Sequence, residues 1–223
     1  FLPRSHILER MFDYLMFAAG VSIAYVESMD TIAANMQEVS PTIVVSVPRV
    51  YEKVYGRITD RALQAGGAKR RIFVWSSKVG ERWATEKLAG RAPAGMLALE
   101  YAVADKLVFA KVRAAVGGRI RYFVSGGAPL STEIARFFYA AGCPIYEGYG
   151  LTETSPVISV NTPARLVIGS VGPPIPGVEV RVADDGEILT RGPHVMKGYL
   201  NHPEATSAAI DADGWFHTGD IGT

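Results

Sequence analysis

Residues 147–154 read Glu-Gly-Tyr-Gly-Leu-Thr-Glu-Thr, and this short loop is the most informative stretch of the chain. The ring of Tyr149 can stack on a nucleotide base, and the glycines beside it let the backbone approach a ligand closely. The hydroxyl of Thr152 can bond a phosphate oxygen, and the carboxylate of Glu153 can hold Mg2+. A plain strand-to-helix turn, in which Tyr149 packs and Glu153 is solvated, fits these residues equally well.

A second glycine-rich turn lies upstream, where residues 125–130 read Ser-Gly-Gly-Ala-Pro-Leu. It follows a strand predicted at 120–124 and precedes a helix predicted at 132–141, with Ser131 as its N-cap. In open α/β sheets, ligands bind in the crevice at such strand ends. A tight connection without a ligand is the alternative interpretation. The turn supplies a second group of candidate binding residues, Gly126, Gly127, Ala128 and Pro129.

Apolar and amphipathic segments alternate upstream of residue 163. Short strands rich in apolar and β-branched residues are predicted at 21–26, 42–47, 120–124 and 144–146. Helices are predicted at 7–19, 29–39, 49–64, 69–88, 96–116 and 132–141. Strands that alternate with helices imply an α/β fold with a mostly parallel sheet and flanking helices.

The pattern changes near residue 163. A turn-rich link at 171–177 precedes an alternating apolar and polar segment at 178–182, which is typical of a half-buried strand. A hairpin-turn signal at 184–186 leads into a further strand at 187–190. We therefore expect an α/β portion over residues 1–163 and a β-rich, distorted barrel-like subdomain over 164–223 of the same domain.

Composition excludes several functional classes. The chain has 223 residues, 48% of them hydrophobic, which is enough for a sizeable core. Its net charge of +1 creates no general attraction for nucleic acid, so no nucleic-acid partner is expected. The densest basic run, at residues 69–71, is interpreted as a solvated helix end, with a membrane-surface role as the less favoured alternative.

The single cysteine and the length of the apolar segments indicate the cellular location to expect. Cys143 is the only cysteine, which excludes an internal disulfide and fits a reducing compartment. Its apolar surroundings predict a buried small side chain and no reactive thiol. The most apolar window, residues 11–26, contains Asp13 and is shorter than the roughly 20 residues of a membrane span. We expect a cytoplasmic protein, and peripheral attachment to a membrane stays open.

Five motifs in order resemble the adenylate-forming superfamily, which contains acyl-CoA synthetases, peptide-synthetase adenylation domains and luciferases. They are the turn at 125–130, the loop at 147–154, Gly-Glu-Ile at 186–188, Gly-Tyr-Leu at 198–200 and Trp-Phe-His-Thr-Gly-Asp at 215–220. The resemblance covers nearly the whole chain, and ordered motifs are far more specific than one glycine pattern. It implies an incomplete N-terminal domain of an acyl-CoA synthetase.

The resemblance implies a role for each matching residue. Tyr149 would stack on adenine, Thr152 would bond the α-phosphate, and Glu153 would coordinate Mg2+. Asp220 would accept hydrogen bonds from both ribose hydroxyls, as the two oxygens of a carboxylate allow. Thr152 and Glu153 are the expected catalytic pair. The rest of the expected nucleotide site consists of Glu147, Gly148, Gly150, Leu151 and the turn Gly126, Gly127, Ala128 and Pro129.

The substrate class is inferred from a long helical insert between the segment at 48–54 and the turn at 126–127, which includes residues 97–118. This insert resembles the long-chain branch of the family, although its apolar residues fit a plain core equally well. The resemblance implies an AMP-forming long-chain fatty-acid–CoA ligase that uses ATP, Mg2+ and CoA. A ligase for another carboxylate, one with a carrier protein as acceptor, and a non-catalytic nucleotide- or acyl-binding relative are the alternatives.

The resemblance also implies parts that these 223 residues do not contain. The phosphate loop of the family is expected before Phe1, and a small C-terminal domain with a catalytic lysine is expected after Thr223. The 223-residue piece alone is therefore expected to be inactive in thioester synthesis.

Overall fold

The computed structural model describes residues 4–223, and the first three residues of the predicted α/β portion lie outside that range. Contacts divide the chain into two compact units. Unit 1 comprises residues 23–147 and 166–170. Unit 2 comprises the described residues up to 22, together with 148–165 and 171–223.

Unit 1 is built on three parallel strands in the order β1 (Ile43–Ser46), β2 (Tyr122–Ser125) and β3 (Ile145–Gly150). The parallel sheet expected from the alternating pattern is thus confirmed. The register pairs Ser46 with Ser125, and Ser125 with Glu147. Because paired residues of neighbouring strands lie on the same face of a sheet, these three polar residues form one row at its carboxyl end.

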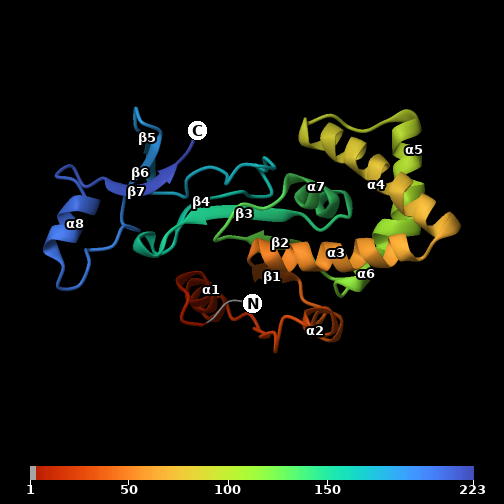
Figure 1. The fold of residues 1–223 in the computed structure, drawn as a ribbon, viewed down its shortest axis with the longest axis horizontal. Helices are drawn as coiled ribbons and strands as arrows, with labels where there is room; N and C mark the ends of the chain where they lie inside the picture. Colours follow the sequence, from red (N-terminus) through yellow and green to blue (C-terminus); the bar gives the residue numbers. More distant parts are fainter. Residues whose placement is uncertain (1–3) are drawn as a thin grey trace. The chain divides into compact units, whose positions relative to one another are not determined.

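Helices surround this sheet in unit 1 (Figure 1). They are α2 (Ile32–Val39), α3 (Pro48–Gln64), α4 (Gly67–Leu88), α5 (Gly95–Ala104), α6 (Ala110–Ala115) and α7 (Thr132–Ala140). Helix α4 packs against α3, α5 and α7. Between α5 and α6 the helix passes through a π-helical segment, η1 (Asp105–Phe109). The sequence predicts one unbroken helix at 96–116, whereas the structure has a π-helical segment inside that range.

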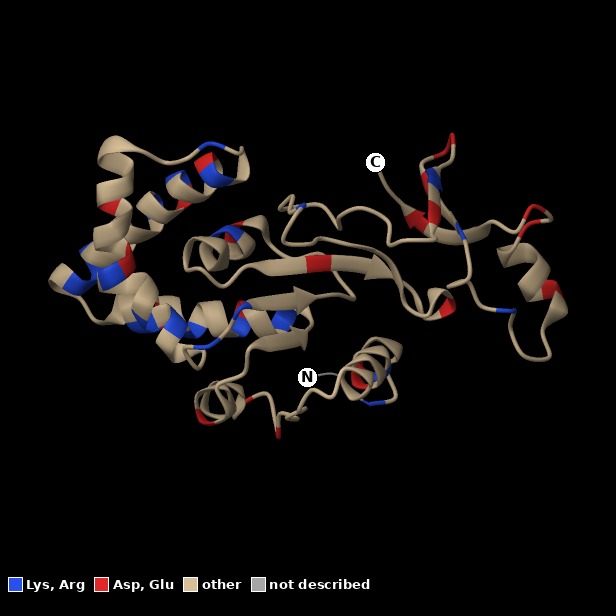
Figure 2. Cartoon of the chain, turned by 180° about the vertical axis from the view of Figure 1, so that it is seen from behind, with Lys and Arg blue, Asp and Glu red and all other residues tan. Residues whose placement is uncertain are grey.

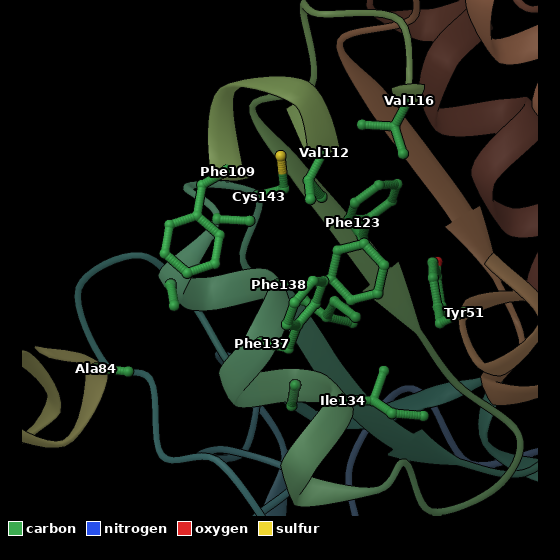
Figure 3. Close-up of a cluster of buried hydrophobic side chains, with 14 of the residues drawn as sticks. Tyr51, Ala84, Phe109, Val112, Val116, Phe123, Ile134, Phe137, Phe138 and Cys143 are labelled. Atoms are coloured by element: carbon green, nitrogen blue, oxygen red, sulfur yellow. The ribbon is translucent and has the colours of Figure 1, made fainter. Parts of the chain in front are cut away.

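The core of unit 1 lies between the sheet and these helices and is rich in aromatic rings (Figure 3). Phe109, Phe123 and Phe138 are fully buried, and edge-to-face contacts join Phe137 to Phe109 and Phe138. Cys143 is buried in the same cluster, as predicted, and burial raises the pKa of its thiol to about 11. The thiol is therefore protonated and inert near neutral pH.

One buried tyrosine connects the helix layer to the sheet. Tyr51 of α3 is 1% exposed and donates from its hydroxyl to the carbonyl oxygen of Val124 in β2, at 2.6 Å. The carbonyl oxygen of Val44 in β1 lies 3.4 Å from the same hydroxyl. Burial raises the pKa of Tyr51 far above its usual range, so the hydroxyl keeps its proton as a donor. Tyr51 thereby ties α3 to two neighbouring strands.

Unit 2 is mostly antiparallel. The end of β3 pairs with β4 (Val157–Val160), and β5 (Glu179–Val182), β6 (Glu187–Arg191) and β7 (Phe216–Ile221) form a separate three-stranded sheet. The unit also contains α1 (Ile7–Ala18), a 3-10 turn η2 (Thr152–Thr154) and α8 (Pro203–Ala209). The expected fold class, an α/β portion followed by a β-rich region, is confirmed.

Some local expectations are wrong. Residues 21–26 form no strand, because apolar composition without a neighbouring strand does not make a ladder. Strands β4 and β7 and helix α8 were not predicted. Across residues 4–223, no helix is both long enough and apolar enough to cross a membrane.

Replacing Tyr51 by phenylalanine removes one hydroxyl and leaves the ring in place. We expect Tyr51→Phe to lower the free energy of unfolding by about 1 kcal/mol, because a buried hydrogen bond is lost. Tyr55→Phe on the same helix is the control, since its hydroxyl bonds Glu133 at an exposed site and should matter by less than about 0.5 kcal/mol. Urea denaturation measures both, and equal losses would contradict the role given to Tyr51.

Candidate functional site

The first residue of the glycine turn after β2 still pairs with the neighbouring strand β1. The N–H of Gly126 donates to the carbonyl oxygen of Ser46 at 3.3 Å, which continues the pairing of β1 with β2. Gly127 has φ of +85°, a conformation that side-chain-bearing residues rarely adopt. Ala128 and Pro129 follow on the surface. Residues 127–129 of this turn are therefore exposed at the carboxyl end of β2.

A buried carboxylate fixes this turn to the neighbouring strand. Glu147 of β3 is 7% exposed, and its Oε1 accepts from the N–H of Leu130 at 3.2 Å. Burial raises the pKa of Glu147, while the N–H groups of Leu130 and Gly169 act in the opposite direction by favouring the charged form. Glu147 holds the Ser125–Leu130 turn in place from within the protein.

Two serines lie in register with Glu147: Ser125 opens the predicted turn at 125–130, and Ser46 was not predicted. The hydroxyls of Ser46 and Ser125 are fully buried and have no hydrogen-bond partner among residues 4–223. Native structures leave few buried polar groups unsatisfied, so such groups usually have a specific role. Ser46 and Ser125 are therefore further candidates for contact with a ligand or an ordered water molecule at this edge.

The loop after Glu147 depends on a close approach of two strands in unit 2. A Cβ on Gly150 would lie 1.7 Å from the carbonyl oxygen of Pro156, so only glycine fits. The pairing of β3 with β4 shifts register at this point. Thr154, fully buried, closes the turn: its hydroxyl accepts from the N–H of Leu151 at 2.9 Å and donates to the carbonyl oxygen of Pro156 at 2.7 Å.

Tyr149 and Asp220, 71 residues apart in the sequence, meet in unit 2. The hydroxyl of Tyr149 donates to Oδ2 of Asp220 at 2.7 Å. Burial is the main reason that the pKa of Tyr149 is raised, and the hydrogen bond to Asp220 raises it further. The Tyr149 hydroxyl therefore keeps its proton and remains a donor. The pair combines an aromatic face with an exposed carboxylate, and the family resemblance implies adenine and ribose as the partners of these two groups.

Strand β6 positions the part of β7 that carries Asp220. Glu187 accepts from the N–H of Gly219 at 2.8 Å, and its other oxygen lies 2.8 Å from Nδ1 of His217. Both hydrogen bonds hold the pKa of Glu187 below its usual range, and the one with His217 has the larger effect. The hydroxyl of Thr218 donates to the carbonyl oxygen of Ile188 at 2.7 Å. Residues 217–219 are thus bonded to β6, and Asp220 follows them on the surface.

Glu153 lies in the 3-10 turn next to exposed Thr152. The hydroxyl of Tyr199 donates to Oε1 of Glu153 at 2.9 Å, and the N–H of Met196 donates to its carbonyl oxygen at 2.7 Å. Oε2 makes no hydrogen bond or ion pair to residues 4–223. The same range contains no group of three His, Cys, Asp or Glu able to hold a metal ion. A single carboxylate fits Mg2+, which binds proteins through one or two carboxylates plus substrate phosphates.

The predicted residues thus occupy two places. Unit 1 holds Gly126 to Pro129 together with Glu147, and unit 2 holds residues 148–153 together with Asp220. Sequence reasoning assigned no role to the residues that position the unit 2 group, namely Thr154, Glu187 and Tyr199. All three lie in the motifs at 147–154, 186–188 and 198–200, which were a usable signal.

Comparison with known proteins identifies the family. The model of the AMP-binding enzyme family matches residues 1–200. The chain belongs to this family. The long-chain-fatty-acid–CoA ligase FadD15 of Mycobacterium bovis is 43% identical over all of this chain and 36% of its own length. The human long-chain-fatty-acid–CoA ligase 6 is 34% identical over all of this chain and 32% of its own length.

Solved structures agree with this membership of the AMP-binding enzyme family. A ternary product complex of a malonyl-CoA ligase with methylmalonyl-CoA and AMP bound superposes with a TM-score of 0.60 at 28% identity, covering 99% of this chain and 40% of that one. The chain therefore spans about a third of the length of the curated relatives it matches.

Glu147 gives a test of the buried carboxylate. Glu147→Ala should cost about 1–3 kcal/mol of unfolding free energy, because the N–H of Leu130 is left buried and unpaired. Glu147→Gln keeps an acceptor and removes the charge. The raised pKa means that folded protein holds this proton more tightly than unfolded chain, so wild type loses stability as pH rises through that pKa. Because glutamine does not titrate, Glu147→Gln should not lose stability over the same pH range.

Denaturation at pH 4 and pH 7.5 checks this expectation. The stability of Glu147→Gln relative to wild type should increase with pH. A difference that does not change with pH would show that Glu147 is not a buried, titrating carboxylate.

Proposed function

We propose that the full-length protein is an AMP-forming long-chain fatty-acid–CoA ligase. In the first step, an oxygen of the fatty carboxylate attacks the α-phosphorus of ATP and pyrophosphate leaves, which gives acyl-AMP. In the second step, the CoA thiol attacks the acyl carbonyl carbon, loses its proton, and displaces AMP. The products are acyl-CoA, AMP and pyrophosphate.

The meeting of Tyr149 with Asp220 is the observation that carries this proposal. An aromatic ring and a carboxylate 2.7 Å from its hydroxyl offer a stacking surface for adenine and an acceptor for the ribose hydroxyls. Each carboxylate oxygen has two lone pairs, so Asp220 can accept from ribose while it keeps its bond to Tyr149. Membership of the AMP-binding enzyme family supports the same assignment.

Thr152 and Glu153 complete the proposed site. The exposed hydroxyl of Thr152 would donate to an oxygen of the α-phosphate. Glu153 would hold Mg2+ through Oε2, while Tyr199 fixes the carboxylate by its bond to Oε1. The metal ion, when bound, offsets charge on the phosphate oxygens during the attack. The protein contributes prearranged donors and charges, which is commonly the largest catalytic contribution.

The long-chain assignment is supported by the named relatives and by the helical insert. The 43% identical protein carries the name of a long-chain-fatty-acid–CoA ligase. The insert forms the end of α3 and the helices α4 to α6. Acyl chain length, the use of CoA and the place of Mg2+ are parts of this proposal.

Fatty-acid-dependent exchange between ATP and pyrophosphate tests the proposed function. The full-length protein should catalyse exchange with long-chain acids and much less with short-chain or aryl acids. A maximum with an aryl acid would point to a ligase for another carboxylate. Folded protein that binds ATP and shows no exchange with any acid would be a non-catalytic relative, which contradicts the proposal.

Glu153 and Tyr199 form a matched pair of variants. Glu153→Gln should reduce exchange by about a hundredfold or more, because the metal-holding charge is lost. Tyr199→Phe removes the bond to Glu153 and keeps the carboxylate, so it should reduce exchange far less. A Mg2+ titration separates the two, and similar losses in both variants would argue that Glu153 acts only as a structural acceptor.

A further inference from the structure

The helical insert and α2 of unit 1 line an open groove of about 670 Å3. It lies among α2, α3, the start of α4, the π segment and α6. Its volume is within the range of about 300–1,000 Å3 that is usual for small-molecule sites. No residue of the Ser125–Leu130 turn or of β3 lines it. The groove is therefore separate from the residues assigned to the nucleotide.

The floor of the groove is apolar. Met36, Phe73, Val108 and Val112 form it from four different elements, and each is at most 9% exposed. Ile72 and Leu107 stand at its opening and are 37% and 39% exposed. Large apolar side chains that remain exposed beside an apolar groove favour a ligand with apolar surface of its own.

The rim carries charge of one sign. All four charged residues that line the groove are basic: Arg57, Arg61, Lys69 and Lys111. Arg57 lies 3.7 Å from Asp30, whereas the side chains of the other three have no ion-pair or hydrogen-bond partner among residues 4–223. Figure 2 shows basic positions along α3 and near the start of α4. Unpaired cations around an apolar floor favour an anionic group attached to an apolar body.

The backbone is irregular at the same place. Leu107 and Val108, which line the groove, belong to the π segment η1. A π segment interrupts the regular rotation of side chains around a helix, and such segments are frequent at functional sites. In this chain it lies between two α-helical parts of one continuous run and contributes both to the floor and to the opening.

We propose that this groove binds a single alkyl chain with an anionic head group. The chain would lie on the floor, and the head group would be held by Arg61, Lys69 and Lys111. The ligand class shared by a free fatty acid and an acyl-CoA meets this description. The proposed function supplies only the class of ligand, and the groove itself is a second acyl site beside the catalytic one.

Photolabelling of the full-length protein with palmitate that carries a terminal diazirine tests the proposal. Digestion and mass spectrometry should place label on residues 105–115, and the label should decrease in excess palmitate. Competition by palmitate alone would assign the site to the free acid, and competition by palmitoyl-CoA as well would extend it to the thioester. Label that stays outside the groove, or that neither competitor reduces, would overturn the proposal.

Charge variants provide the matched control. Lys69→Glu combined with Lys111→Glu should reduce labelling about tenfold. Lys78→Glu combined with Lys106→Glu changes exposed lysines of α4 and η1 outside the groove and should leave labelling unchanged. The methyl ester of the probe has no charge and should label wild type as weakly as the acid labels the first variant. Equal labelling by acid and ester would contradict the role of the basic rim.

A bulky side chain in the groove tests whether the ligand occupies the groove, without a change in surface charge. Ala65→Trp places a large side chain at the groove, from an exposed position after α3, and should abolish the label. Ala68→Trp, exposed nearby and outside the groove, should not. Full labelling of Ala65→Trp would contradict the proposal.

The experiment needs no ATP, so its result is independent of catalysis. Glu153→Gln should label normally in the groove although exchange is lost. Protein that exchanges pyrophosphate with palmitate and never labels the groove would overturn this inference and leave the proposed function standing.

Discussion

A buried carboxylate in strand β3 is the constraint on which the glycine turn of unit 1 depends. Glu147 lies at the end of a row of polar residues on three parallel strands, and it holds the glycine turn through the N–H of Leu130 at 3.2 Å. The chain accepts the cost of a desolvated carboxylate at this point, as its raised pKa indicates. The segment with Tyr149 and Glu153 begins at the residue after Glu147, in unit 2.

In unit 2, too, hydrogen bonds within the protein hold the candidate residues in place. Asp220 is placed by its neighbours: Glu187 holds His217 and Gly219, and Ile188 accepts from Thr218. Glu153 is oriented by Tyr199, and the turn that carries it is closed by buried Thr154. The unit 2 groups proposed for the nucleotide are exposed or half-buried, and the groups that position them are hydrogen-bonded within the protein. Such preorganisation lets a site act on charge that develops during reaction.

The structural features that depend on local sequence pattern were predicted. Alternating segments gave the parallel sheet and its helices, and the glycine-rich motifs gave the candidate site. Strand β7 was missed because residues 216–221 include a glycine and polar residues, and their strand conformation comes from pairing with β6. The contact of Tyr149 with Asp220 and the row of Ser46, Ser125 and Glu147 arise from tertiary packing. The groove was not predicted for the same reason, since its basic residues come from three different helices.

A crystal structure of the full-length protein with a non-hydrolysable acyl-adenylate analogue would test the central claim most directly. The account predicts adenine on the ring of Tyr149, both ribose hydroxyls at Asp220, and the phosphate mimic within hydrogen-bond distance of Thr152. An adenosine moiety bound away from Tyr149 and Asp220 would contradict it.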